Sequence, residues 1–188
     1  MAESTFPIQT MSIEEYLELE KDSPVRHEYV GGRLYAMTGT SKRHNRIAIN
    51  IGRKLADASE DTPCQVYMSD VKVRTPDDRC YYPDVMVSCD DESDDAYVEH
   101  APCLIVEVTS PSSAATDRRE KRMSYLALPS LRVYLVVDQE RPYVEHHIRL
   151  ESGAWVQRDY IGEGEFYVPC PSAHLTLADI YAGVQGQA

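Results

Sequence analysis

The sequence predicts a mixed α/β (α+β) domain, in which a β-sheet core is flanked by helices. The chain has 188 residues, of which 43% are hydrophobic and 27% are charged, and these values are typical of a globular domain with a substantial core. Apolar segments of strand length are interspersed with amphipathic segments of helix length. No repeat, linker or low-complexity tract divides the sequence, so residues 1–188 are expected to form a single domain.

The N-terminal part is expected to contain a helix, a β-hairpin and a second helix. Ser12 and Glu15 form a capping-box pattern, which marks the start of the first helix. The pair Gly31-Gly32 marks the hairpin turn, and apolar residues at four-residue steps mark the second helix. The expected ranges are 12–20 for the first helix, 27–30 and 34–37 for the hairpin strands, and 41–59 for the second helix.

The rest of the chain is expected to supply most of the sheet. Segments rich in β-branched residues predict strands, and the continuous apolar segment 133–137 predicts a central strand buried on both faces. Asp117 and Glu120 fit the N-terminal cap of a helix that precedes this strand. A hairpin and a short helix follow it. The expected ranges are 65–74, 82–88, 103–109 and 133–137 for strands, 110–113 for a break, 117–128 for the helix, 152–153 for the hairpin turn, and 177–181 for the last helix.

Two of the expected strands each carry one carboxylate among apolar neighbours. Asp84 follows Tyr-Tyr-Pro and precedes Val-Met-Val, and Glu107 lies within Leu-Ile-Val-Glu-Val-Thr. A buried carboxylate destabilises the fold unless a metal ion, a basic partner or solvent at a strand end compensates its charge. A Lys/Arg-rich helix follows, so the two acids predict a divalent-metal site for phosphodiester chemistry. The alternative interpretation of Asp84 is a turn cap after Pro83.

The charge distribution limits the classes of partner. A net charge of −12 disfavours nonspecific binding to nucleic acid. The charge is uneven, however, because acidic residues gather in 90–95 while basic residues gather in 42–54 and 118–122. A local basic face can still bind phosphate, and the alternative is that both basic segments are solvated helix faces.

The cysteines and the N-terminus indicate a reducing compartment. The five cysteines contain no C-x-x-C pair, and the sequence begins without the basic and apolar regions of a secretory signal. We therefore expect reduced, mostly buried cysteines, a cytoplasmic protein and no membrane segment. A structural zinc site built from cysteines so far apart in sequence is the less favoured alternative.

The motifs, taken in order, resemble the PD-(D/E)XK nuclease fold and, within it, the Uma-type restriction-endonuclease-like family. The resemblance covers nearly the whole chain. The segments that carry it are 26–37, His44-Asn45-Arg46, Tyr82-Pro83-Asp84-Val85, 105–112, 117–121, Tyr125 and 134–138.

The resemblance implies a restriction-endonuclease-like sheet with N-terminal helix and hairpin additions and a C-terminal hairpin. It also implies a Mg²⁺-dependent DNA endonuclease in which Asp84 and Glu107 bind metal and Glu28 is a further acid of the site. The sequence departs from the general nuclease pattern because no lysine stands two residues after Glu107. The resemblance implies that Lys121, on the next helix, takes its place.

Other residues complete the expected site. The Val108 carbonyl is a candidate neutral ligand, and Mn²⁺ is a candidate substitute for Mg²⁺. Lys121 has the alternative of pairing with Asp117, and Glu28 that of an exposed strand acid. Tyr125 is expected to pack with its hydroxyl near the site, whereas Asp70 is expected to point outward. The candidate phosphate or DNA contacts are His44, Arg46, Arg118 and Arg122; an ordinary surface histidine is the alternative for His44.

Two other functions fit the same residues. One is a catalytically inactive nuclease-fold module that binds nucleic acid or mediates assembly, which the net acidity and the displaced lysine favour. The other is a metal-dependent hydrolase of small phosphoesters. A homodimer is also expected, since double-strand cleavage suits two symmetric sites.

Overall fold

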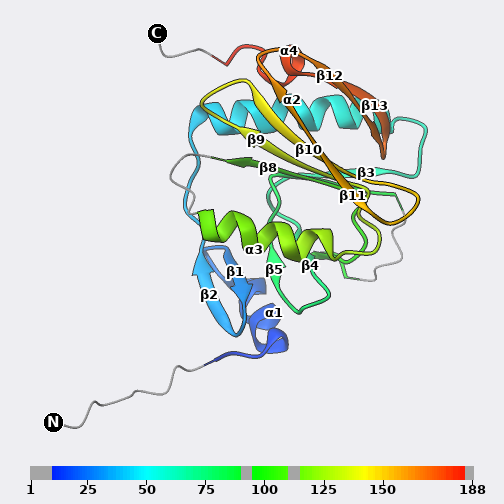
Figure 1. Cartoon of the computed structure of the whole chain (residues 1–188). Helices are drawn as coiled ribbons and strands as arrows, with labels where there is room; N and C mark the ends of the chain where they lie inside the picture. The colour runs from blue at the N-terminus through cyan, green and yellow to red at the C-terminus, as the bar shows by residue number, and fades with distance from the viewer. Residues whose placement is uncertain (1–9, 90–94, 110–114, 185–188) are drawn as a thin grey trace, which may run out of the picture.

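The computed structural model of the protein describes residues 10–89, 95–109 and 115–184 and has a central six-stranded sheet with helices on both faces (Figure 1). The strand order in this sheet is β11-β10-β9-β8-β6-β3. A second sheet has the order β2-β1-β5-β4-β7, and β12 and β13 form a separate hairpin. The bounds are α1 Ile13–Asp22, β1 His27–Val30, β2 Arg33–Ala36, α2 Lys42–Ser59, β3 Gln65–Tyr67, β4 Lys72–Arg74, β5 Cys80–Tyr81, β6 Val85–Ser88, β7 Val98–Glu99, β8 Leu104–Thr109, α3 Ala115–Leu126, β9 Val133–Asp138, β10 Tyr143–Arg149, β11 Trp155–Ile161, β12 Glu165–Pro169, β13 Ser172–Thr176 and α4 Leu177–Ile180.

The two faces of the central sheet pack against different helices. Successive side chains of a strand point to opposite faces, so Val85 and Val87 of β6 share one core with α2, whereas Met86 belongs to a second core with α3. The same alternation holds along β8, where Val106 faces α2 and Ile105 faces α3. Asp84 lies two residues from Met86, and Glu107 lies two residues from Ile105. Both acids are therefore expected on the face of the sheet that packs against α3.

Most of the expected elements are confirmed. The capping box of α1 is present, with Ser12 and Glu15 bonded to each other's backbone N–H. The α2 residues Ile47, Ile51 and Leu55 are fully buried along one helix face. Strand β9 is central and apolar, and it runs parallel to β8, to which α3 connects it.

Two expected strands are divided in the structure. The segment 65–74 forms β3, which pairs with β6 in the central sheet, and β4, which pairs with β5 in the smaller sheet. Between them, Ser69 adopts a left-handed conformation with φ of 57°. The segment 82–88 forms a strand only from Val85 onward. Pro83 has no N–H to donate to a sheet ladder, which explains why the strand begins after it.

Some elements were missed or misplaced by the sequence analysis. The β12–β13 hairpin was missed, although Phe166 and Val168 are buried on either side of the exposed Tyr167 and show the expected alternation. The short strand β7 was missed as well. The expected cap at Asp117 is wrong, since α3 begins at Ala115. The expected break at 110–113 and most of the acidic segment lie outside the described residues.

The expectation of reduced cysteines is not met. The structure joins Cys64 to Cys89 and Cys103 to Cys170 as disulfides and leaves Cys80 free and buried. The partners are 25 and 67 residues apart, so no spacing motif marks the pairs in the sequence.

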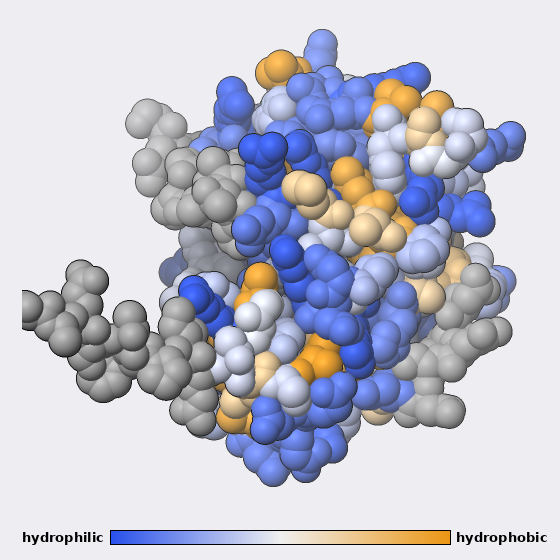
Figure 2. Space-filling view, turned by 60° about the horizontal axis from the view of Figure 1, so that its bottom comes forward, coloured by the Kyte–Doolittle hydropathy of each residue, from blue (hydrophilic) through white to orange (hydrophobic). Residues whose placement is uncertain are grey.

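The surface shown in Figure 2 is mainly hydrophilic, and its apolar residues lie in small separate patches. The described residues of this face therefore show no broad apolar interface. Among the described residues, no helix combines the length and the apolar character needed to cross a membrane.

Candidate functional site

The pairing of β6 with β8 brings the two candidate metal-binding acids together. The strands are antiparallel, with Val85 opposite Val106, and extending this register by one residue places Asp84 opposite Glu107. Directly opposed residues of an antiparallel pair project from the same face of the sheet. Both carboxylates therefore lie on the α3 side, as the expectation of a shared site requires.

Asp84 is held by contacts on both of its carboxylate oxygens. The Val108 N–H donates to Asp84 Oδ2 at 2.7 Å, and His44 Nε2 lies 2.8 Å from Asp84 Oδ1. His44 is positioned by the first turn of α2, where its backbone N–H donates to the capping hydroxyl of Ser41. These contacts fix the direction of the Asp84 carboxylate, and they make His44 a member of the site instead of an ordinary surface histidine.

Glu107 lies beneath α3 and accepts a hydrogen bond from a tyrosine. The hydroxyl of Tyr125 donates to Glu107 Oε1 at 2.8 Å. Burial raises the pKa of Glu107 to about 8, an effect that Lys121 and the Tyr125 hydrogen bond oppose and the nearby Asp84 and Glu28 reinforce. The site is thus an acidic cluster whose negative charge the surrounding protein compensates only in part.

Lys121 of α3 reaches the acidic cluster through Glu28 of β1. Its Nζ lies 2.6 Å from Glu28 Oε1, and the ammonium also lies 5.5 Å from the ring centre of Tyr81. Glu28 is therefore an enclosed, paired acid and not the exposed strand acid of the alternative interpretation. The side chain of Asp117, the other candidate partner of Lys121, lies outside the described residues. Burial is the dominant cause of the raised pKa of Tyr125 as well, so this hydroxyl stays protonated and remains a donor.

The charged side chains are enclosed but not sealed from solvent. Between 12% and 16% of the side-chain surface is exposed in each of Glu28, His44, Asp84 and Lys121. Their contacts are therefore less screened by water than those of surface ion pairs, while an ion or a phosphate group from solvent still has access to them.

The candidate phosphate contacts differ in their placement. His44 lies inside the cluster. Arg46 is exposed on α2 and Arg122 is partly buried on α3, and within the described parts of the chain neither is seen in contact with the acids. The side chain of Arg118 lies outside the described residues. Asp70 is exposed and paired with Arg26, as expected for an outward charge.

Sequence reasoning missed two parts of the site. One is the Tyr81 ring beside Lys121, and the only signal for it was its place two residues before Pro83. The other is the Val108 N–H, which was missed because only the Val108 carbonyl was considered. A backbone donor of this kind follows from the relative positions of strands and leaves no mark in residue type.

Comparison with known proteins assigns the chain to a family and finds a solved structure with a similar fold. Residues 13–178 match the family model Uma2, described as "Putative restriction endonuclease". Two uncharacterized proteins of Synechocystis sp. are similar to the chain: one is 31% identical over 181 residues, covering 95% of each chain, and the other is 32% identical over 155 residues, covering 79% of this chain and 86% of the relative. The crystal structure of "a putative nuclease belonging to DUF820" from Anabaena variabilis superposes with a TM-score of 0.74 at 14% identity, covering 92% of this chain and 98% of that one.

Proposed function

Because the chain belongs to the Uma2 family of restriction-endonuclease-like proteins, we propose that it is a Mg²⁺-dependent nuclease that hydrolyses phosphodiester bonds in DNA. The observation that carries the proposal is the convergence of Asp84 and Glu107 from two paired strands, with Lys121 supplied from the neighbouring helix. Lys121 is the candidate replacement for the lysine that is missing two residues after Glu107, because its ammonium contacts Glu28 and its charge acts on Glu107, and this supports a catalytic role over the inactive alternative.

The donor set suits a hard divalent cation. Asp84 and Glu107 offer carboxylate oxygens, the Val108 carbonyl is adjacent in sequence to Glu107, and Mg²⁺ prefers such oxygen ligands. Each ionised carboxylate oxygen has a second lone pair besides the one used in its observed contact. Bound Mg²⁺ would acidify water and offset negative charge on the reacting phosphate.

The protein's own residues would orient these ligands and the substrate. His44 and the Val108 N–H hold the two oxygens of Asp84, and Tyr125 holds Glu107, so both acids are fixed before any ligand arrives. Lys121 places a positive charge beside the acids, where it would attract phosphate oxygens or orient the attacking water. The partial enclosure of the cluster strengthens these charge interactions.

Cleavage of supercoiled plasmid in the presence and absence of Mg²⁺ tests the proposal. Wild-type protein should nick or linearise the plasmid only with Mg²⁺ or Mn²⁺. Glu107→Gln should reduce the rate by at least about 100-fold, which is the usual cost of removing a preorganised charge from an active site. Glu145→Gln is the matched control, since Glu145 is also a partly buried acid of the central sheet but contacts His147 on β10 instead of the cluster.

Two results would contradict the proposal in different ways. Equal cleavage by wild type and Glu107→Gln would place the activity elsewhere. Mg²⁺ binding without cleavage of duplex, single-stranded or branched DNA would instead identify a nuclease-fold binding module.

A further inference from the structure

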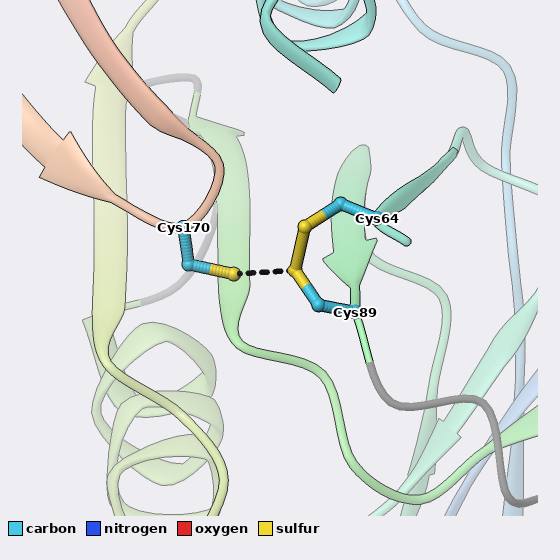
Figure 3. Close-up of side chains that lie close together, drawn as sticks. All are labelled: Cys64, Cys89 and Cys170. Carbon is cyan, nitrogen blue, oxygen red and sulfur yellow. Dashed lines mark hydrogen bonds between the residues drawn. A yellow bond between two sulfur atoms is a disulfide. The ribbon is translucent and has the colours of Figure 1, made fainter. Parts of the chain in front are cut away.

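Four cysteines from distant parts of the sequence converge at the end of the central sheet opposite the acids. Cys64 immediately precedes β3, Cys89 immediately follows β6, Cys103 immediately precedes β8, and Cys170 lies in the turn of the β12–β13 hairpin. Figure 3 shows three of them, with Cys170 pointing toward the Cys64–Cys89 pair. These four residues are called the cysteine cluster below.

The sulfur atoms make contacts across the two disulfides. Cys89 Sγ lies 3.2 Å from Cys170 Sγ and 3.6 Å from Cys103 Sγ, and the sulfurs of Cys64, Cys89 and Cys170 all lie within 4.8 Å of one another. Thiolates around tetrahedral zinc, with Zn–S bonds of about 2.3 Å, are separated from one another by about 3.8 Å. The sulfur contacts across the two disulfides are therefore already close to the spacing of a tetrathiolate site, and reduction of the two S–S bonds would let the bonded sulfurs separate to that spacing.

The surroundings are those of a closed structural site. Cys64, Cys103 and Cys170 are 6–9% exposed and belong to the apolar core between the sheet and α2. Structural zinc sites are closed in this way, with four protein ligands and no open position, and soft thiolates favour zinc over Mg²⁺. Hydrogen bonds fix the local backbone, including one from Cys103 N–H to the Val87 carbonyl at 2.8 Å and one from Cys64 N–H to Thr62 Oγ1 at 3.1 Å.

We propose that the cysteine cluster, in its reduced form, binds one Zn²⁺ ion as a tetrathiolate site. The ion would tie together β3, β6, β8 and the β12–β13 hairpin. Strands β6 and β8 also carry the two acids, and Asp84 lies five residues from Cys89, which is about 16 Å along an extended strand. The site would therefore stabilise the strand pair from its far end without touching the acids.

Formation of the site from the disulfide form requires a reductant, which a small-molecule thiol supplies. For each disulfide, two molecules of the thiol give up two electrons and two protons, becoming one reductant disulfide and leaving two protein thiols. Zn²⁺ then replaces the four thiol protons, which pass to solvent, and four Zn–S bonds form.

Cobalt spectroscopy on the reduced full-length protein tests the proposal, because Co²⁺ takes the place of Zn²⁺ in tetrahedral thiolate sites. One thiolate-bound Co²⁺ per chain should appear, identified by sulfur-to-cobalt charge-transfer absorption and intense visible bands, and Zn²⁺ should displace it. Loss of a group that merely supports a ligand costs about 10–100-fold in metal affinity, so replacing any one cluster cysteine by alanine should weaken binding by at least about 100-fold. Cys80→Ala is the matched control and should retain the wild-type spectrum, since Cys80 is buried on β5 outside the cluster.

A second measurement covers variants that fail to fold. In reduced wild-type protein, Zn²⁺ should raise the melting temperature, and a strong chelator should reverse the change. A folded, reduced wild type without the cobalt spectrum would overturn the proposal, as would a spectrum that survives in the cluster variants. The outcome is independent of nuclease activity, because Asp84→Asn should leave the cobalt spectrum unchanged.

Discussion

The two ends of the β6–β8 strand pair carry different clusters of side chains, and at both ends the fold brings the residues together. At one end, carboxylates converge with a lysine, a histidine and a tyrosine; at the other, four cysteine sulfurs converge. In both places the residues come from elements far apart in the sequence. The sequence favoured a site only at the acidic end and left a cysteine site as the less favoured alternative, because a carboxylate among apolar residues is unusual, whereas a cysteine among them is not.

The largest expected effect is on cleavage by Lys121→Ala. Removing the one described cation of the acidic cluster should lower the cleavage rate by about 100–1000-fold, as loss of a single preorganised charge commonly does. The affinity for Mn²⁺ should stay the same or rise, since a positive charge has been removed. The measurements are plasmid cleavage rates and Mn²⁺ titration calorimetry.

Lys54→Ala is the control for Lys121→Ala, because Lys54 pairs with Asp179 on the α2 side of the molecule and does not contact the acids. Wild-type turnover by Lys121→Ala would reject its assigned role.

The next largest effect is on the change in melting temperature that Mg²⁺ or Mn²⁺ produces at the acidic end of the strand pair. Mg²⁺ or Mn²⁺ should raise the melting temperature of wild type, and Asp84→Asn should lose most of that shift. In the absence of metal the variant should melt close to wild type, since weaker repulsion of Glu107 is offset by a weaker contact with Val108 or His44. Melting curves with and without metal measure both quantities.

Asp70→Asn serves as the control for the metal response, since Asp70 is an exposed acid paired with Arg26. An equal metal-induced shift in wild type and Asp84→Asn would remove Asp84 from the site.

The pH dependence of folding stability tests whether burial raises the pKa of Glu107. Its pKa is raised from 4.5 to about 8, so between these pH values the unfolded chain loses a proton that the folded protein keeps. Folding stability of the metal-free protein should therefore fall as pH rises through this window. Glu107→Gln does not ionise, so its melting temperature should exceed that of wild type by an amount that grows from pH 4.5 to pH 8. Melting temperatures that run parallel across this range would contradict the raised pKa.

The smallest expected effect is that of Tyr125→Phe. The hydroxyl of Tyr125 stabilises the ionised form of Glu107, so its removal should raise the pKa of Glu107 further and shift the acidic limb of the cleavage profile to higher pH. The free-energy cost should be about 1.5–3 kcal/mol, as for a hydrogen bond to a charged group. The cleavage rate measured against pH checks the shift, and an unchanged profile would leave Tyr125 with a packing role alone.

Local signals were sufficient for much of the fold. The capping box at Ser12 and the glycine pair at Gly31-Gly32 specify an element boundary or a turn within a few residues. The division of the segment 65–74 was not foreseeable in this way, because it depends on the pairing of β3 and β4 with strands of different sheets.

The same distinction separates the parts of the site. Asp84 and Glu107 were found from their apolar neighbours, and Lys121 and Glu28 were found only through the family resemblance. The contacts of His44 with Asp84 and of Tyr81 with Lys121 arise from the packing of α2, β5 and α3 against the sheet, which sequence spacing does not encode.

A crystal structure of the protein grown with Mn²⁺ and measured at an anomalous wavelength would test whether Asp84 and Glu107 share one metal ion. We expect an anomalous peak bonded to oxygens of both carboxylates, at metal–oxygen distances of about 2.1–2.2 Å. A peak that contacts only exposed acids, or no peak at the cluster in a protein that cleaves DNA with Mn²⁺, would contradict it.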